Sequence, residues 1–278
     1  MSKKKQALVP VNILALGGGV QSSTIAIMAA KGVITPMPDA AIFADTHGEP
    51  EVVYRWLDYL KDQLPYPLLT TSAGSLEENE LTMRISAKTG LKNLRSTIPA
   101  FVLKENGSVG LLGRKCTRDF KIRPIHRAAR KFMKSMGRKR INIWIGISTD
   151  EAHRMKPSRL KYISNSWPLI DMGMSRSDCL KWMSENGYPT PPRSACRFCP
   201  FHGDEEWRNL KSNHPEDFAK AVAFEKNLQA TYKDQEVMKG VPFLHRTCSS
   251  LNTVDFTQRP GHQQIALFGN ECEGLCGV

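Results

Sequence analysis

Hydrophobic positions in the first 75 residues fall into short apolar runs that alternate with segments of helical periodicity. The runs "VNILAL", "AAIFADT" and "PLLTT" predict three strands. Between them, residues 22–31 and 51–64 have the spacing of helices. This strand–helix–strand–helix order is typical of a parallel sheet with helices on its faces, so the pattern predicts an α/β fold.

The second half of the chain continues this alternation less regularly. Residues 73–113 lose the pattern and contain scattered Gly and Ser, which predicts an insertion over the site. Residues 119–136 predict a helix, "INIWIGIS" a strand, "SWPLIDM" a further strand, and residues 176–186 a helix. A proline-rich loop, a charged helix over residues 204–233 and an extended tail of about 40 residues follow. We therefore divide the chain into a nucleotide-binding α/β domain, residues 1–190, and a cysteine-containing extension, residues 191–278.

Composition places the chain among globular proteins and locates its charge. Of the 278 residues, 41% are hydrophobic and 24% charged, and no apolar run is long enough to span a bilayer. The first six residues, "MSKKKQ", are basic, but the segment that follows lacks the small-residue cleavage site of a secretory signal peptide. We therefore expect a cytoplasmic protein with no membrane partner. The formal net charge is +12, and the segment from Arg114 to Arg140 holds twelve Lys and Arg against one acid, Asp119. This basic block predicts an anion-binding face rather than an ordinary solvated face, where acids would be interspersed.

Three glycines connect the first predicted strand to the first predicted helix. Gly17, Gly18 and Gly19 follow "VNILAL", and Gln21, Ser22 and Ser23 open the helix. Backbone N–H groups at such a helix N-terminus favour a bound anion. The loop is neither a Walker A loop nor a GxGxxG fingerprint. It is either a phosphate cradle or a plain strand-to-helix turn.

Several segments resemble a known family. The glycine loop is similar to the PP-loop (Ser-Gly-Gly-x-Asp-Ser) of the adenine nucleotide α-hydrolase superfamily, with Gly17 replacing the serine and Gln21 the aspartate. The segments "FADTHGEPEVVY", "RKCTRDFKIRP", "WIGISTDEAHRM" and "WPLIDMGMS" resemble phosphoadenosine-phosphosulfate (PAPS) reductases, in the same order along residues 12–207. The matching residues are Asp45, Thr46, Glu49, Tyr54, Cys116, Lys121, Pro124, Gly146, Glu151 and Arg154. Ser148 stands where that family has an arginine.

The resemblance implies a mostly parallel five-stranded sheet, adenine nucleotide α-hydrolase-like, with the nucleotide at its carboxyl edge, as open α/β sheets favour. The implied nucleotide-binding residues are Gly17, Gly18, Gly19, Gln21, Ser22, Ser23, Asp45, Thr46, Gly146 and Arg154. Asp45 is a candidate for a ribose or Mg²⁺ contact, or for a helix cap. The cations predicted to hold phosphate, sulfate or nucleic acid are Arg114, Lys115, Arg118, Lys121 and Arg123.

Cysteine spacing points to metal or redox chemistry rather than to disulfides, because seven cysteines are unevenly spaced in a chain expected to be cytoplasmic. Cys196 and Cys199 form a CxxC half-site suited to zinc or iron–sulfur. Cys116 lies where the resemblance places cluster cysteines. Together they imply a three-cysteine 4Fe–4S cluster with one open iron, as in the tRNA thiolation branch of the superfamily. If instead a side chain of the protein provides a fourth ligand, the candidates are Cys248 or, for a zinc ion, His202.

The C-terminus, "GNECEGLCGV", is similar to the reductase tail Glu-Cys-Gly-Leu-His. The resemblance implies that Cys272 attacks the sulfonate sulfur, with Cys276 resolving the product. A frayed terminus, or a second metal half-site with Cys248, is the alternative.

Three functions follow from these features. The first is a PAPS-reductase-like oxidoreductase that uses an adenine nucleotide and a thioredoxin-like thiol reductant, favoured by Gln21 and the tail cysteines. The second is an ATP-dependent nucleic-acid sulfurtransferase of the DNA phosphorothioation or tRNA thiolation kind, favoured by the basic block. The third is a non-catalytic nucleotide- or nucleic-acid-binding module, favoured by the loss of the PP-loop serine and aspartate.

Overall fold

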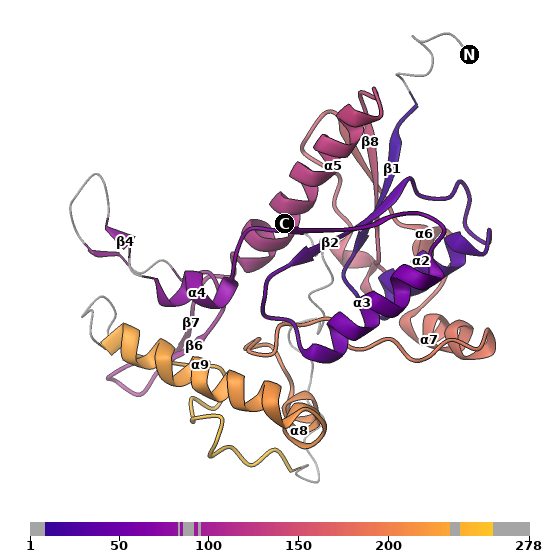
Figure 1. Cartoon of the computed structure of the whole chain (residues 1–278). Helices are drawn as coiled ribbons and strands as arrows, with labels where there is room; N and C mark the ends of the chain where they lie inside the picture. The colour runs from indigo at the N-terminus through magenta and orange to yellow at the C-terminus, as the bar shows by residue number, and fades with distance from the viewer. Residues whose placement is uncertain (1–8, 83, 86–91, 94–95, 234–239, 258–278) are drawn as a thin grey trace.

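A computed structural model describes residues 9–82, 84–85, 92–93, 96–233 and 240–257. Its central feature is a five-stranded sheet in the order β3-β2-β1-β8-β9, and every adjacent pair is parallel (Figure 1). The strands are β1 (Val11–Leu16), β2 (Ala40–Asp45), β3 (Leu68–Ser72), β8 (Ile141–Ile145) and β9 (Ile163–Ser166). The sheet confirms the predicted α/β fold class.

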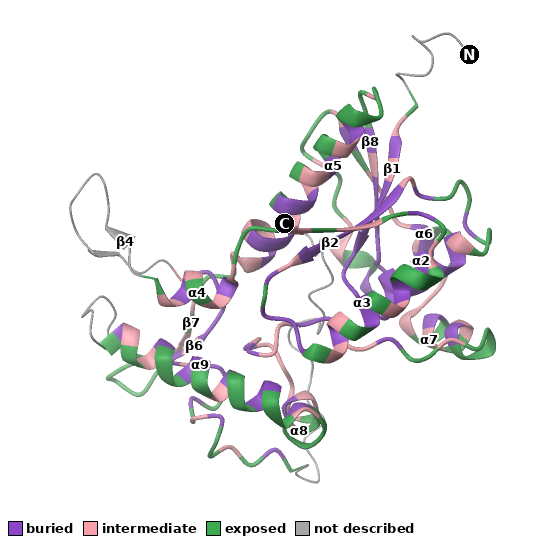
Figure 2. Ribbon diagram, viewed as in Figure 1, coloured by how far each residue is buried: buried purple, intermediate pink, exposed green. Residues whose placement is uncertain are grey.

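The three central strands are apolar and buried on both faces, as parallel strands covered by helices require. Ile13 of β1 pairs with Ala40 on one side and with Ile143 on the other, so their side chains meet in the middle of the sheet. The edge strands β3 and β9 carry Thr and Ser and are half-exposed. Figure 2 shows the resulting buried centre of the sheet.

Helices cover both faces of the sheet. One face packs against α2 (Val20–Ala30), α3 (Glu51–Gln63), α6 (Pro168–Asp171) and α7 (Arg176–Glu185). The other face packs against α5 (Arg123–Ser135), which turns Ile125, Ala129 and Met133 inward at four-residue spacing. Because α2 lies between the sheet and its neighbours, ten of its residues are buried, and its N-terminus is held firmly at the sheet edge.

A second core lies beyond the carboxyl edge of the sheet. It joins α4 (Leu76–Leu81), α8 (Asp204–Asn213) and α9 (Pro215–Lys233) around the buried Trp207 and Phe224. A small sheet in the order β10-β6-β7 lies beside it, formed by Val241–Phe243, Phe101–Leu103 and Val109–Leu111. The short strands β4 (Arg84–Ile85) and β5 (Lys92–Asn93) form a separate pair. Residues from both sides of position 190 thus share one core, and that boundary stays a prediction.

Two predicted elements are wrong in kind or extent. "SWPLIDM" was expected to be a strand, but the strand ends at Ser166 and Pro168 begins α6. Proline fits the first helical turn, where no N–H partner is needed.

The single helix expected over residues 204–233 is two helices, because the chain breaks at His214 before Pro215. A π-helical turn, Thr117–Ile122, precedes α5 and re-aims the residues that follow Cys116.

The C-terminal part is more ordered than an extended tail up to residue 257. Val241–Phe243 form β10, which pairs antiparallel with β6. Residues 258–278 lie outside the described part of the chain. Among the residues described, no helix combines the length and the apolarity that a membrane crossing demands.

Candidate functional site

The carboxyl edge of the sheet brings the glycine loop together with the segment after β8. The chain leaves β1 towards β2 on one side, while β8 lies on the other, so the order of the strands reverses between β1 and β8. Open α/β sheets bind ligands at such a switch point. There, Gln21 Nε2 donates to Ser148 Oγ and Glu151 Oε2, each at 3.4 Å. Two of the segments that carry the family resemblance therefore meet at one place.

The glycine loop is shaped by its own hydrogen bonds. Gly18 has φ +80°, and a Cβ there would lie 3.3 Å from Val53, so glycine suits the position. Ser22 Oγ accepts from the Gly17 N–H at 3.1 Å, and Ser23 Oγ accepts from Trp56 Nε1 at 2.9 Å. Both serines are buried. Their hydroxyls hold the loop to the protein, which leaves the backbone N–H groups at the start of α2 as the groups suited to an anion.

A cavity of about 820 Å³ reaches the first turn of α2 at Gln21, but the predicted nucleotide contacts Gly17, Gly18, Gly19, Ser22 and Ser23 are not in its wall. Its wall includes Gln21, Arg176 and Arg193, together with Glu151 and Glu206. Arg176 Nη1 donates to Gln21 Oε1 at 2.9 Å, and Arg193 forms an ion pair with Glu206. The volume falls within the usual range for cofactor and ligand sites, roughly 300–1,000 Å³. Gln21, which replaces the family aspartate, thus faces a cavity of nucleotide size and is oriented by an arginine.

The end of β2 forms a tight turn around Asp45. Asp45 Oδ1 accepts from the Tyr54 hydroxyl at 2.8 Å and from the His47 N–H at 2.7 Å. Burial, followed by the hydrogen bond to Asp45, raises the pKa of Tyr54. His47 adopts the left-handed conformation with φ +58°, and its ring lies 3.0 Å from Ser72 Oγ. Asp45 therefore stabilises the turn that presents Thr46 and Glu49.

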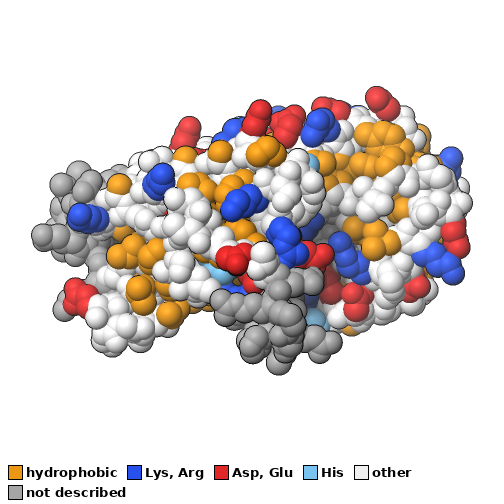
Figure 3. All heavy atoms as spheres, turned by 90° about the horizontal axis from the view of Figure 1, so that it is seen from below, with side chains coloured by type: hydrophobic (Ala, Val, Ile, Leu, Met, Phe, Trp, Pro, Cys, Tyr) orange, Lys and Arg blue, Asp and Glu red, His pale blue; other side chains and the backbone are white. Residues whose placement is uncertain are grey.

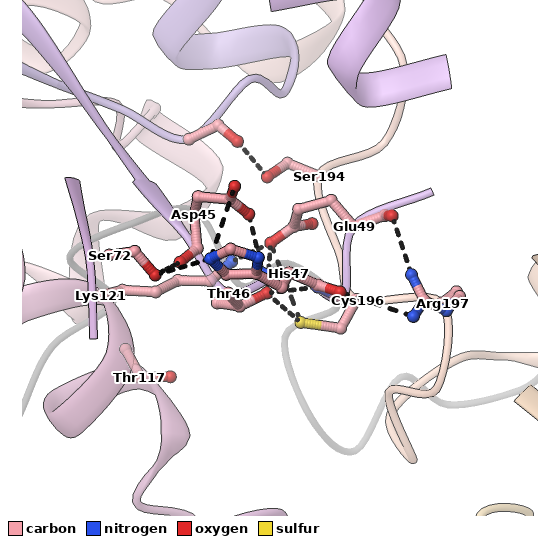
Figure 4. Close-up of polar contacts among 12 residues, drawn as sticks. Asp45, Thr46, His47, Glu49, Ser72, Thr117, Lys121, Ser194, Cys196 and Arg197 are labelled. Atoms are coloured by element: carbon pink, nitrogen blue, oxygen red, sulfur yellow. Dashed lines mark hydrogen bonds and ion pairs between the residues drawn. The ribbon is translucent and has the colours of Figure 1, made fainter. Parts of the chain in front are cut away.

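A buried ion pair and a thiol lie next to this turn (Figure 4). Lys121 Nζ is 3.2 Å from Glu49 Oε1, and the two side chains are only 5% and 0% exposed. Cys196 Sγ lies 3.3 Å from Thr46 Oγ1 and 3.8 Å from Glu49 Oε1. Burial raises the pKa of the Cys196 thiol, Glu49 raises it further, and Lys121 opposes them. The free thiol is therefore the protonated form.

The three cysteines predicted to act together line one small cavity. Cys116, Cys196 and Cys199 surround a space of about 30 Å³, with Lys121 and Arg114 also in its wall. This is room for about one water molecule. The cysteines come from positions about 80 residues apart in the chain, so their convergence is a product of the fold.

The loop that carries Cys196 and Cys199 contacts the sheet edge and its neighbours through a backbone hydrogen bond and several side chains. The Arg197 N–H donates to the Gly48 carbonyl at 2.7 Å, and Arg197 Nη2 pairs with Glu77 at 3.0 Å. The Phe198 ring covers Gly48 so closely that a Cβ there would lie 2.8 Å from it. Ser194 donates to the Gly17 carbonyl. The loop therefore touches the ends of both β1 and β2.

The predicted fourth ligands do not line the three-cysteine cavity. His202 Nε2 lies 2.9 Å from the Cys196 carbonyl, and the ring lines the large cavity instead. Burial, with a smaller effect from Arg193, lowers the pKa of His202 to about 3, so the ring is neutral. Cys248 is buried on the segment after β10. Over the described ranges, no three His, Cys, Asp or Glu side chains are grouped closely enough to hold a single metal ion. Cys272 and Cys276 lie outside those ranges.

The predicted anion-binding cations separate into different environments. Lys121 is buried against Glu49, whereas Arg118 and Arg123 both pair with Asp119. Arg114 stacks over Phe201 at 5.5 Å and donates to Thr117, and Lys115 is half-buried beside it.

The predicted nucleotide contact Gly146 is buried directly after β8. Arg154 pairs with Glu151 and lines a cavity of about 190 Å³ on the other side of β8.

Sequence reasoning did not single out several residues that shape the site. Arg176 and Arg193 line the large cavity, and Ser194 joins the cysteine loop to the glycine loop. Arg176 begins α7, directly after the capping residue Ser175, so the start of a helix was the available signal. Ser194 sits two residues before the CxxC motif in an irregular loop, where no periodicity predicts a contact.

Comparisons with known proteins add little to this geometry. No protein-family model matches the chain, and no curated protein matches it either. Among solved structures, the chain is similar to a crystal structure of phosphoadenylyl-sulfate (PAPS) reductase from Candida auris, a phosphate complex. The identity is 16%, the alignment covers 69% of this chain and 82% of the reductase, and the TM-score is 0.41. A likeness this distant carries no functional argument, and the fold assignment rests on the sheet itself.

Proposed function

We propose that this protein is an enzyme that binds an adenine nucleotide at the carboxyl edge of its sheet and carries out thiol- or iron–sulfur-dependent sulfur chemistry, as PAPS reductases do. The observation that carries the proposal is the convergence of Cys116, Cys196 and Cys199 on one cavity beside the end of β2. Three thiols gathered next to a candidate nucleotide site suit chemistry on a sulfur-bearing or adenylated substrate.

The nucleotide is assigned to the large cavity at the start of α2. The helix N-terminus supplies N–H groups and a positive dipole for phosphate. Arg176 and Arg193 are the arginines of the cavity wall, which also carries Asp150, Glu151, Glu205 and Glu206. Gln21 supplies an amide in place of a carboxylate, so it repels a phosphate less than aspartate would. PAPS and ATP are both candidates, and the choice between them distinguishes the reductase from the sulfurtransferase.

We assign the three cysteines to an iron–sulfur cluster, in which each thiolate binds a different iron, so the sulfurs need not meet at one point as they would around a single ion. Within the described residues no three side chains form a compact single-ion site. The space between the three cysteines, about 30 Å³, holds about one water molecule in this structure, so the assignment requires the cavity wall to move outward when a cluster binds. When bound, a cluster supplies electrons or an open iron for sulfur. The protein holds the three thiols, with Lys121 and Arg114 in the same wall, and binding of the metal would itself deprotonate the thiols.

Metal analysis tests the cysteine assignment directly. Protein purified without oxygen is assayed for iron, acid-labile sulfide and zinc, alongside Cys116→Ser, Cys199→Ser and the control Cys179→Ser. Cys179 is buried inside α7 and lines no part of the cavity. We expect iron and sulfide in the wild type and the control, and loss of both in the cavity variants. Stoichiometric zinc without sulfide would instead support a zinc site.

Product analysis tests the reaction. The reductase predicts sulfite from PAPS in the presence of a thioredoxin-like reductant, with loss of activity in Cys272→Ser. Full activity in Cys272→Ser would remove the tail cysteine from the mechanism. Pyrophosphate release from ATP stimulated by RNA or DNA, without sulfite from PAPS, would favour the nucleic-acid sulfurtransferase. Neither product, despite nucleotide binding, would favour the non-catalytic binding module.

One observation favours the sulfurtransferase as a second candidate. Both predicted fourth ligands, His202 and Cys248, are absent from the wall of the three-cysteine cavity. A cluster held by three cysteines has one iron without a protein ligand, and that iron is free to bind sulfur. If the wild-type protein holds a cluster, and if Cys248→Ser and His202→Ala contain as much iron as the wild type, the result would support this second candidate.

A further inference from the structure

Helix α5 and the loop that follows β8 present a large group of exposed cations, which we call the basic face. The sequence of α5 contains five Lys and Arg and no acid, and its apolar side is turned to the sheet. The residues of the basic face are Arg123, Arg127, Arg130, Lys131 and Lys134 of α5 and Lys156, Arg159 and Lys161 of the loop, all of them exposed.

The helix and the loop form one continuous surface. The Arg130 guanidinium lies 5.8 Å from the centre of the Tyr162 ring, directly after the loop. His126 of α5 lines the same cavity as Lys156 and Arg159 of the loop. The cations of the helix and of the loop therefore belong to one surface.

The basic face differs from the other charged surfaces of the molecule. Arg123 pairs with Asp119, whereas Arg127, Lys131 and Lys134 form no ion pair with any residue in the described ranges. By contrast, the exposed side of α3 carries Glu51, Asp58 and Asp62 as well as Arg55 and Lys61, and Lys61 pairs with Asp58. The side of the molecule shown in Figure 3, seen from below the view of Figure 1, also mixes acidic and basic side chains. Charge of one sign along α5, unpaired at Arg127, Lys131 and Lys134, indicates a polyanionic partner.

A cavity of about 190 Å³ lies at the N-terminal end of this face. Its wall is apolar at Ile145, Ile147 and Trp167, and cationic at Arg118 and Lys156. An apolar wall with an aromatic ring and neighbouring cations suits a planar base whose phosphate lies among the cations.

We propose that the basic face binds single-stranded nucleic acid, with the phosphates along α5 and one unstacked base in the cavity beside Trp167. At 13 residues α5 is about 20 Å long, enough to contact several phosphates. The binding step needs neither the adenine nucleotide nor a metal, so it stands apart from the proposed function.

Fluorescence anisotropy of labelled 20-nucleotide strands tests the phosphate contacts. The variant Arg127→Ala/Lys131→Ala/Lys134→Ala is compared with the matched control Lys220→Ala/Lys226→Ala/Lys233→Ala, which removes three exposed lysines from α9. In 50 mM salt we expect at least tenfold weaker binding for the α5 variant and less than twofold change for the control. The slope of log Kobs against log[salt] is expected to fall by about 2, since each single-strand phosphate contact contributes about 0.7.

Other probes test the kind of partner. We expect single-stranded DNA or RNA to bind more tightly than a duplex of the same sequence, and more tightly than an abasic strand of equal length. Trp167→Ala, which removes the aromatic ring from the cavity wall, is expected to reduce the advantage over the abasic strand. The proposal is overturned if the α5 and α9 variants weaken binding equally, or if the duplex or abasic strand binds as tightly. Binding to phosphatidylserine vesicles without binding to any nucleic acid would also overturn it.

Discussion

Lys121 illustrates how one side chain changes meaning between sequence and structure. In the sequence it belongs to a basic block that predicts an anion-binding surface. In the folded protein the ammonium is buried against Glu49, beside Cys196. Glu49 Oε2 has no hydrogen-bond partner within the described residues, so Lys121 provides most of the compensation for this buried carboxylate. Sequence spacing cannot reveal such a pair, because Glu49 lies in the loop between β2 and α3 and Lys121 in the π-helical turn before α5.

We predict that Lys121→Met destabilises the fold, because it leaves the buried Glu49 carboxylate without its cation. Breaking a buried ion pair from one side reduces the free energy of unfolding by about 3–5 kcal/mol. Urea denaturation monitored by circular dichroism measures the change. The double variant Lys121→Met/Glu49→Gln removes both charges and is expected to recover a large part of the loss. A single variant within about 1 kcal/mol of the wild type would show that the pair contributes little.

Glu80 gives a prediction about pH. Burial raises the pKa of this carboxyl above its ordinary value, although Thr97 and Ser96 donate hydrogen bonds to it. Below the ordinary pKa both the folded and the unfolded states keep the proton. As pH rises above it, the unfolded state ionises first, so the free energy of unfolding falls until the raised folded pKa is reached.

The variant Glu80→Gln tests this sign. Glutamine keeps an acceptor for the Thr97 N–H but cannot ionise, so its contribution to stability does not change with pH. From pH 4 upward, we expect the free energy of unfolding to fall less steeply in Glu80→Gln than in the wild type. The two slopes differ by at most about 1.4 kcal/mol for each pH unit between the ordinary pKa of the carboxyl and its raised pKa in the folded state. Urea denaturation across pH 4–7 measures it. Parallel pH profiles for wild type and variant would contradict the assignment.

At the scale of elements, the hydrophobic pattern predicts the sheet well and the irregular parts poorly. The runs at β1, β2 and β8 are buried on both faces, so their apolar character shows in the sequence. The edge strand β9 has the polar sequence "ISNS", which does not match the apolar pattern of a buried strand. The apolar run "WPLID" that follows matches it better, so the strand was predicted there instead. The break at Pro215 was visible in the sequence, because proline cannot continue the hydrogen bonding of a helix.

The contact of the cysteine loop with β2 leads to a further prediction. Phe198 packs over Gly48, where a Cβ would come within 2.8 Å of the ring. We predict that Gly48→Ala displaces Phe198 and the loop, and that it reduces the free energy of unfolding by about 1–3 kcal/mol, as overpacking does. It is also expected to lower iron content, because Cys199 follows Phe198. Gly74→Ala is not a suitable control because of its positive φ. Gly113→Ala is the control, since a Cβ there meets no atom within 4 Å.

Iron content and stability together decide how this result is read. Loss of both in Gly48→Ala, with neither changed in Gly113→Ala, supports the role of the Phe198 contact in placing the cysteines. A destabilised protein with full iron content would show that the loop holds its cysteines by other contacts, such as the Arg197–Gly48 hydrogen bond.

At the scale of the whole molecule, the site is a property of topology. The family resemblance implied that residues of the glycine loop and of the segment after β8 bind one nucleotide, which stays a prediction. In the structure the two segments meet, since Gln21 Nε2 donates to Ser148 Oγ. The sequence could not show that Ser194 and Cys196 reach back to β1 and β2, because an irregular proline-rich loop has no periodicity from which to predict its path. Nor could it show which cations would be paired, since Asp119 lies between Arg118 and Arg123 and neutralises part of the block.

Nucleotide binding is the whole-molecule property that most directly tests the large cavity. A ligand present at 100 times its Kd stabilises the folded state by about 2.7 kcal/mol. For a chain of this size that corresponds to a rise in Tm of roughly 5–10 °C. We expect such a rise with PAPS or ATP, measured by differential scanning fluorimetry, and a smaller rise for Gln21→Ala/Arg176→Ala, because both residues line the cavity.

The matched control is Lys181→Ala on the exposed side of α7, where the lysine pairs with Glu185 at the surface. Its ligand-induced rise in Tm is expected to equal that of the wild type. If neither nucleotide raises the Tm, or if Lys181→Ala and the cavity variant lose the rise equally, the cavity is not the nucleotide site. If only one nucleotide raises the Tm, its identity selects between the two reactions: PAPS for reduction, and ATP for adenylation of an acceptor.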